Sequence, residues 1–230
     1  MSTMEIFLVI FALVSVVHVT AIYIRKGKLR RISKIFIVPP LLAAYIAGQE
    51  TPLIFPILAL LFGWLGDALL LRISDKTYFR LGLASFLLGH VCYIITFIER
   101  LGFFGPGGAG SFSVTAMAVF IPIAIIVGVV DFRFMNPPKE MFFLVALYMI
   151  VIETMAFWGL EIMILNPGLA GILIFAGALC FMISDTMLGY YTFRVLTLPG
   201  AVLIMVLYIM AQAGIVIGLL LLNSPVVPLT

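Results

Sequence analysis

Long uninterrupted apolar runs constrain this chain more than any other feature of its sequence. A segment of about 20 apolar residues can cross the roughly 30 Å hydrocarbon core of a bilayer as a helix, which satisfies its own backbone hydrogen bonds. Only 10% of the residues are charged and 64% are hydrophobic, whereas about a quarter of the residues in a soluble domain are charged. The sequence therefore predicts an all-α integral membrane protein.

Eight apolar segments predict an eight-transmembrane-helix bundle that forms one domain over residues 1–230. The second segment is short, contains Pro39 and Pro40, and requires Lys34 to snorkel toward the headgroups. Because the basic cluster follows the first apolar run, we interpret that run as an anchor and not as a cleaved signal peptide. The predicted spans are 5–24, 34–48, 52–71, 80–98, 113–130, 141–160, 168–189 and 199–222.

Lys and Arg residues are concentrated in alternate connections of this bundle. Cytoplasmic loops are enriched in these residues, so both termini are predicted to lie on the non-cytoplasmic side of the membrane, which is the inner membrane if the source is bacterial. The cluster "RKGKLRRISK" lies between two predicted spans, which favours contact with anionic lipid over nucleic-acid binding. Among the connections between consecutive spans, the even-numbered ones contain only Arg100. The first, third, fifth and seventh contain the other twelve basic residues: Arg25, Lys26, Lys28, Arg30, Arg31, Lys34, Arg72, Lys76, Arg80, Arg133, Lys139 and Arg194.

Two aspartates lie at a matching depth in two predicted spans. At a rise of about 1.5 Å per residue, Asp67 and Asp185 each lie roughly 6 Å from the end of the third or seventh span. Their surroundings, "GDALL" at 66–70 and "SDTML" at 184–188, share a small residue, Asp, two further residues and Leu. An ionisable residue inside a span is costly unless it is paired or hydrated, so both are candidate site residues. Capping or structural pairing near the headgroups is the alternative.

Other polar residues inside the spans are candidates for supporting roles. His90 and Tyr93 share a small, polar face of the fourth span with Gly82, Ser85, Phe86 and Gly89, and they either act directly or hydrogen-bond between helices. Glu153 lies too deep in the sixth span to snorkel, although its face is otherwise apolar. His18 fits a packing histidine. The last span contributes Tyr208 and Gln212, one turn apart.

Several kinds of site are disfavoured by the sequence. The two histidines lie on separate spans, and Cys92 and Cys180 lie inside spans, so neither a zinc site nor a disulfide framework is predicted. No P-loop, Ser-His-Asp or GxSxG pattern is present. The carboxyl groups of Asp67 and Asp185 are therefore the candidate reactive groups, and no metal or organic cofactor is expected.

The motifs of five spans, taken in order, resemble the YhhN family of multispanning membrane proteins, which includes the lysoplasmalogenases. The resemblance extends from about residue 30 to 222 and implies that Lys34 takes the place of the basic residue that opens the family's second helix, although the prolines that follow it are displaced here to positions 39 and 40. The matching stretches are "LLFGWLGDALLL" (60–71), "FRLGLASFLLGHVCYIITF" (79–97), "LYMIVIETM" (147–155), "GALCFMISDTML" (177–188) and "LYIMAQAGIV" (207–216).

This resemblance implies hydrolysis of the vinyl ether bond of lysoplasmalogens to an aldehyde and glycerophosphocholine or glycerophosphoethanolamine. The reaction protonates the β-carbon of the vinyl ether, and water captures the oxocarbenium-like cation that results. One protonated carboxyl group and one carboxylate would serve these steps, as they do in glycosidases. We therefore expect Asp67 and Asp185 to be catalytic, with either one as the acid. His90, Tyr93, Glu153, Tyr208 and Gln212 are expected to support them.

A lysophospholipid is amphipathic, so its headgroup is expected at the cytoplasmic mouth of a cavity, in contact with Lys34, Arg72 or Arg80. Two other classes of protein remain open. The likeness of the third and seventh spans favours a duplicated four-helix unit, as in a proton-coupled transporter, and the Tyr-Ile pairs at 93–94 and 208–209 extend that likeness. The third class is a non-catalytic lipid-binding membrane protein.

Overall fold

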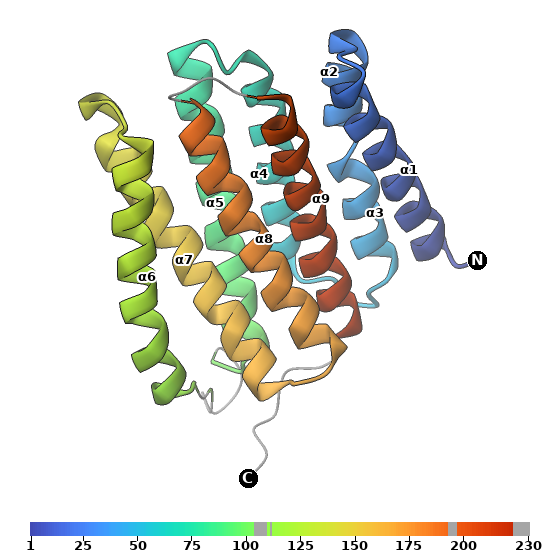
Figure 1. The fold of residues 1–230 in the computed structure, drawn as a ribbon. Helices are drawn as coiled ribbons and strands as arrows, with labels where there is room; N and C mark the ends of the chain where they lie inside the picture. Colours follow the sequence, from blue (N-terminus) through green and yellow to red (C-terminus); the bar gives the residue numbers. More distant parts are fainter. Residues whose placement is uncertain (104–109, 111, 193–196, 223–230) are drawn as a thin grey trace.

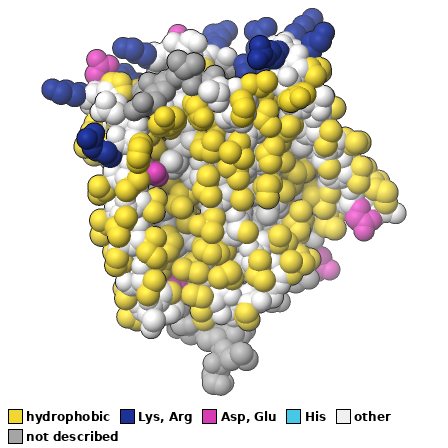
Figure 2. Space-filling model, viewed as in Figure 1, with side chains coloured by type: hydrophobic (Ala, Val, Ile, Leu, Met, Phe, Trp, Pro, Cys, Tyr) yellow, Lys and Arg dark blue, Asp and Glu magenta, His cyan; other side chains and the backbone are white. Residues whose placement is uncertain are grey.

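The described part of the chain is almost entirely helical (Figure 1). The computed structural model describes residues 1–103, 110, 112–192 and 197–222. Within these ranges, seven helices are long and apolar enough to span a membrane, and Figure 2 shows apolar side chains covering the visible face of the bundle. The seven are α1 (Thr3–Tyr23), α4 (Ile54–Leu69), α5 (Lys76–Arg100), α6 (Val114–Met135), α7 (Phe142–Leu165), α8 (Leu169–Thr192) and α9 (Leu198–Leu221). The protein is therefore an integral membrane protein, as predicted.

The second predicted span differs from the prediction because its helix is broken. The chain forms α2 (Gly27–Ile35) and then α3 (Val38–Ala47), whose 10 residues are too few to cross a bilayer alone. Pro39 has no N–H with which to pair the carbonyl of Ile35, four residues earlier. The indole N–H of Trp64 on α4 donates to that carbonyl instead, at 2.9 Å. The count of eight crossings stays a prediction.

Together, α2 and α3 run antiparallel to α1. His18 Nδ1 lies 2.9 Å from Ser33 Oγ toward one end, and Gly48 packs against Met4 and Leu220 at the other. The start of α1 and the last turn of α9 therefore lie at the same end of the bundle. Lys and Arg side chains gather at the opposite end in Figure 2, which we call the basic end. Which side of the membrane each end faces stays a prediction, and Arg194 lies outside the described residues.

Two antiparallel helix pairs, α4 with α5 and α8 with α9, are tightly packed through small residues. A Cβ added to Gly89 on α5 would lie 3.1 Å from the carbonyl oxygen of Ala59 on α4. One added to Gly177 on α8 would lie 2.9 Å from the carbonyl oxygen of Ala211 on α9. All six residues of the small, polar face predicted for α5 are buried, which confirms that prediction. By contrast, no residue in the most apolar stretch of α6 is buried.

Helix contacts repeat between the two halves of the chain. The first half comprises α1–α5 and the second α6–α9, with short 3₁₀ turns at η1 (Leu70–Arg72) and η2 (Lys139–Met141). In each half the last two helices pack together, and the last helix crosses to the other half: α5 contacts α7, and α9 contacts α3. This pattern supports the duplicated four-helix unit that the similar aspartate motifs predict.

Candidate active site

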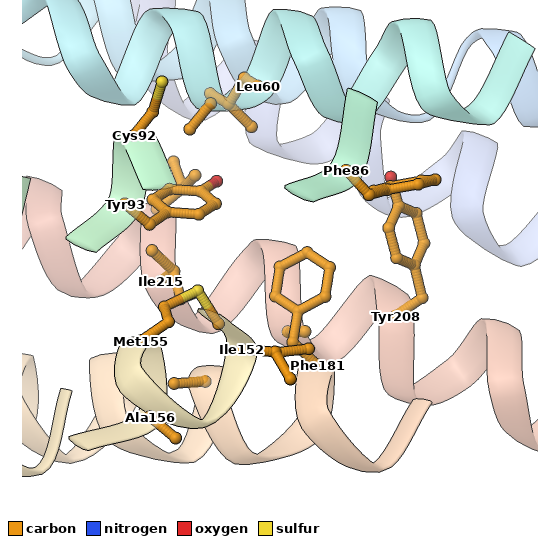
Figure 3. Close-up of a cluster of buried hydrophobic side chains, with 14 of the residues drawn as sticks. Leu60, Phe86, Cys92, Tyr93, Ile152, Met155, Ala156, Phe181, Tyr208 and Ile215 are labelled. Atoms are coloured by element: carbon orange, nitrogen blue, oxygen red, sulfur yellow. The ribbon is translucent and has the colours of Figure 1, made fainter. Parts of the chain in front are cut away.

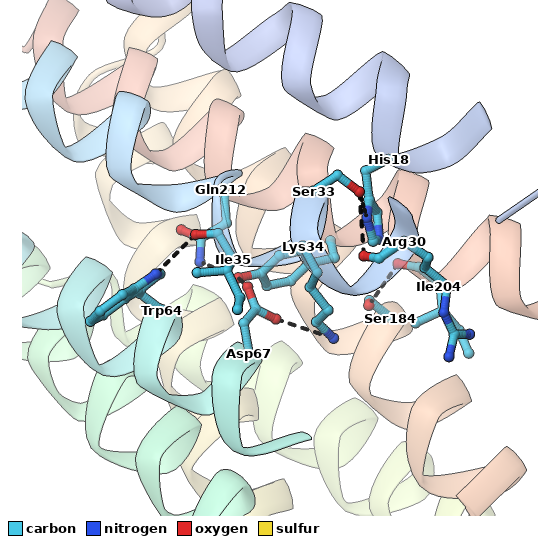
Figure 4. A network of polar contacts seen from close by, with 11 residues as sticks. His18, Arg30, Ser33, Lys34, Ile35, Trp64, Asp67, Ser184, Ile204 and Gln212 are labelled. Atoms are coloured by element: carbon cyan, nitrogen blue, oxygen red, sulfur yellow. Dashed lines mark hydrogen bonds and ion pairs between the residues drawn. The ribbon is translucent and has the colours of Figure 1, made fainter. Parts of the chain in front are cut away.

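Asp67 is held near the basic end of α4 by an ion pair and a hydrogen bond. Lys34 Nζ, from the last turn of α2, lies 3.3 Å from Asp67 Oδ1 (Figure 4). The phenol of Tyr208 on α9 donates to Asp67 Oδ2 at 2.7 Å. The side chains of Lys34 and Asp67 are 19% and 2% exposed, so Asp67 is buried and Lys34 is partly buried.

The predicted residues Tyr93, Tyr208 and Gln212 join this same network. Tyr93 on α5 donates its hydroxyl to Gln212 Oε1 at 3.0 Å. Gln212 Nε2 in turn donates to the Tyr208 hydroxyl at 3.3 Å. A continuous chain of hydrogen bonds thus runs from α5 through α9 to Asp67, and it fixes the orientation of the carboxylate.

Asp185 on α8 is held by a different pair of partners. The hydroxyl of Tyr148 on α7 donates to Asp185 Oδ2. Nε2 of His90 on α5 lies 3.2 Å from the same oxygen and 2.9 Å from the Tyr148 hydroxyl. Nδ1 of His90 is buried and has no hydrogen-bond partner among the described residues. An imidazole that donates through Nε2 therefore keeps a free lone pair on Nδ1.

Tyr148 is the site residue that sequence reasoning did not identify. It is the only tyrosine in α7 and the second residue of the family-like stretch "LYMIVIETM". That isolated phenol in an apolar span was the available signal. The sequence pattern drew attention to Glu153 in the same helix, but it could not show which of the two side chains faces Asp185.

An aromatic ring separates the two carboxylate clusters. The Phe181 ring lies 5.0 Å from the His90 ring and 5.6 Å from the Tyr208 ring, between centroids. Figure 3 shows Phe181 beside Tyr208 in the buried core. The clusters of both aspartates therefore pack against one aromatic ring of the core.

Two cavities flank these clusters. The Asp185 cavity, of about 40 Å³, is lined by Asp185, Tyr148 and mainly apolar side chains. The Lys34 cavity, of about 180 Å³, is lined by Lys34, His18, Arg30 and apolar side chains. Leu70 and Leu188 line both cavities, so the two are adjacent. The Asp185 cavity exceeds the roughly 15 Å³ that a water molecule needs, so a water molecule fits beside Asp185.

Three predicted site residues lie away from the aspartates. The Glu153 carboxylate faces α6, where a Cβ on Gly128 would lie 3.2 Å from Oε1. Arg72 donates to the Tyr78 hydroxyl at 2.7 Å, and Arg80 lies 3.2 Å from Glu140 Oε2. The structure thus brings His90, Tyr93, Tyr208, Gln212 and Lys34 together with the aspartates, but not Glu153, Arg72 or Arg80.

A spacing of 118 residues relates the two aspartate sites. Asp67 and Asp185 are 118 residues apart, as are Leu70 and Leu188. The same offset relates His90 to Tyr208, each of which bonds to the aspartate of the other half. Tyr93 is therefore not the counterpart of Tyr208, as the matching Tyr-Ile pairs had indicated. The helix contacts and the 118-residue spacing are shared by the two halves, but the side chains that bond to the two aspartates differ.

Comparison with known families finds one match, and it spans the whole candidate site. The YhhN family model matches residues 29–219, which contain both aspartates and every partner named above. The chain belongs to the YhhN family. No curated protein and no solved structure gives a significant match. Within the described part of this YhhN chain, no group of three or more His, Cys, Asp or Glu residues is arranged to hold a metal ion.

Proposed function

We propose that this YhhN family protein is a membrane-embedded hydrolase that cleaves the vinyl ether bond of lysoplasmalogens. One observation carries the proposal. Asp67, which is buried, and Asp185, whose side chain is 11% exposed, come from different halves of the chain, their clusters pack against the same Phe181 ring, and Asp185 lines a cavity that is otherwise mainly apolar. Its apolar lining suits an aliphatic enol ether that enters when the cavity widens, and the carboxyl group at its wall suits the chemistry of that bond.

In this proposal Asp185 is the acid, because its carboxyl group lines the cavity. Its proton passes to the β-carbon of the vinyl ether, and the α-carbon becomes an oxocarbenium ion. Water adds to that carbon and gives up a proton to the Asp185 carboxylate, which the first step has left deprotonated and which lines the cavity. The hemiacetal then collapses, its ether oxygen takes up a proton, and an aldehyde and a free glycerol hydroxyl are released.

Tyr148 and His90 position the Asp185 carboxyl group through their hydrogen bonds. Asp67 lies on the other side of the Phe181 ring from Asp185 and acts through its charge. Its negative charge favours the cation, and Lys34 and Tyr208 hold it in place. The apolar lining of the Asp185 cavity, which includes Leu83, Phe86 and Met149, would contact the hydrocarbon chain.

The test is release of aldehyde from a synthetic lysoplasmalogen by the purified protein in detergent. A lysolipid with a saturated alkyl ether in place of the vinyl ether is the matched control, since it has no enol ether to protonate. We expect aldehyde from the first and none from the second. Absence of aldehyde from plasmenylcholine and plasmenylethanolamine lysolipids alike would remove the proposed activity.

The repeated architecture favours a second candidate, a proton-coupled transporter. Parallel repeats with a site at their interface are a feature of several transporter folds. Here α5 and α9 each cross to the opposite half and meet its aspartate. Aldehyde release without any gradient supports the hydrolase. Proton-driven accumulation of an intact lysolipid in proteoliposomes, without aldehyde, would favour the transporter.

A further inference from the structure

A basic groove at the surface of the bundle adjoins the carboxylate region. The Lys34 cavity meets another cavity of about 440 Å³, lined by Arg25, Gly27 and Arg30 on the α1–α2 side and by residues of α9 on the other. Ile22, Arg30 and Ala201 line both. We call the two together the basic groove. Lys34 lies at its inner end and Arg25 at its outer end.

The charge of this groove is not balanced by carboxylates. Lys34 is paired with Asp67. Within the described part of the chain, Arg25 and Arg30 form no salt bridge, and neither cavity is lined by an Asp or Glu side chain. Figure 4 shows Arg30 near His18 and Ser33. Two unpaired guanidinium groups along one groove favour an anion, and their planar donor arrays match the oxygens of a phosphate.

The groove leads toward the Asp185 cavity. Leu70 and Leu188 separate the Lys34 cavity from the Asp185 cavity. The described lining of the Asp185 cavity contains no Lys or Arg. One ligand that carries a phosphate at one end and an apolar chain at the other would therefore meet a basic surface and an apolar one in succession.

We propose that the basic groove binds the phosphate group of a lysophospholipid, with Arg25 and Arg30 as its main ligands. The proposal rests on the proposed function, because the phosphate would place the ether bond beside Asp185. It assigns headgroup recognition to two arginines at the α1–α2 junction. Arg72 and Arg80 are already engaged by Tyr78 and Glu140 and do not line the groove.

The experiment measures binding and needs no turnover. The purified protein is titrated with an alkyl-ether lysophosphatidylcholine, which cannot be cleaved, and with an alkylglycerol of the same chain that lacks the phosphate. Removing one charged hydrogen-bonding group costs about 1.5–3 kcal/mol, or roughly 10- to 100-fold in affinity. Arg30→Gln should weaken binding of the phosphate-bearing lipid by about that factor and leave binding of the alkylglycerol unchanged. Arg25→Gln should act in the same direction.

Arg80→Gln is the matched control, because it removes an arginine at the same end of the bundle but outside the groove. It should change neither affinity more than about twofold, and Arg30→Lys should retain more affinity than Arg30→Gln. Equal losses in Arg30→Gln and Arg80→Gln, or no loss in Arg30→Gln, would overturn the proposal. Equal weakening of both ligands by Arg30→Gln would also overturn it, since the effect would not depend on phosphate.

Competition by inorganic phosphate shows whether the groove binds only a lipid headgroup or also the free ion. Displacement of the lipid at millimolar phosphate, lost in Arg30→Gln, supports a site that also accepts the free ion. Binding of the lipid that phosphate does not displace, but that Arg30→Gln weakens, supports a headgroup site. Either result stands even if no lysoplasmalogen is hydrolysed, so failure of the proposed activity and failure of the groove are separate outcomes.

Discussion

The Asp67 and Asp185 sites share one construction. Each aspartate receives one partner from an earlier helix of its own half, Lys34 on α2 or Tyr148 on α7. Each receives a second from the last helix of the other half, Tyr208 on α9 or His90 on α5. The two halves are thus tied together at both carboxylates.

The two sites differ in charge and access. Asp67 has a cationic partner and a side chain that is 2% exposed, whereas Asp185 has an uncharged phenol and an imidazole as partners and is 11% exposed. A buried ion pair is costly to break, because removal of one partner strands the other charge. The comparison teaches that one scaffold can close one carboxylate behind an ion pair and leave its counterpart at the wall of a cavity.

The largest expected effect is that of Asp185→Asn on turnover. Loss of the proton donor should lower the rate of aldehyde release by about 1,000-fold, within the range for general acids. The variant should elute as the wild type does in size-exclusion chromatography, because Asn keeps an oxygen that can accept from Tyr148. A rate within tenfold of wild type would exclude Asp185 as the acid.

The Asp67 site should instead respond most in stability. Asp67→Asn leaves the Lys34 ammonium without its counter-charge, and we expect a loss of about 2–4 kcal/mol in the free energy of unfolding, since Lys34 keeps some exposure. Denaturant unfolding in detergent measures this. The double variant Asp67→Asn, Lys34→Met should recover part of the loss, because it removes both charges. An unchanged stability in the single variant would show that the ion pair is not structural.

His90 and Tyr208, which correspond in the two halves, should separate activity from stability. His90→Gln replaces the ring that contacts Asp185 Oδ2 with a flexible amide, so the acid is held less firmly and turnover should fall about 10- to 100-fold. Tyr208→Phe removes a hydrogen bond to a buried carboxylate, which should cost about 2 kcal/mol in stability and less than tenfold in rate. The reverse pattern would mean that Asp67, and not Asp185, faces the substrate.

The smallest effect is expected from Glu153→Gln. Its carboxylate faces Gly128 of α6 and makes no hydrogen bond to either aspartate cluster. Aldehyde release should stay within about twofold of the wild type, measured in the same assay. A loss comparable to that of His90→Gln would place Glu153 in the catalytic region after all.

Much of the fold follows from residue type along the chain. Runs of apolar residues predict the membrane-spanning helices because a bilayer offers the backbone no other partners. The small face of α5 is visible in its helical spacing, and both aspartates stand out because charge inside a span requires compensation. The break between α2 and α3 was signalled by Pro39 and Pro40, but the role of Trp64 as a substitute donor was not, since it lies 29 residues from Ile35.

By itself, the sequence determined that this chain is a membrane-embedded helical protein, that two aspartates lie within its apolar spans, and that the chain resembles the YhhN family. Only the tertiary structure decided which partner each carboxylate has. His90 meets Asp185 across 95 positions of the chain, and Tyr208 meets Asp67 across 141. Such contacts depend on how helices rotate and cross when they pack, and helical periodicity specifies a face without naming the helix that will cover it.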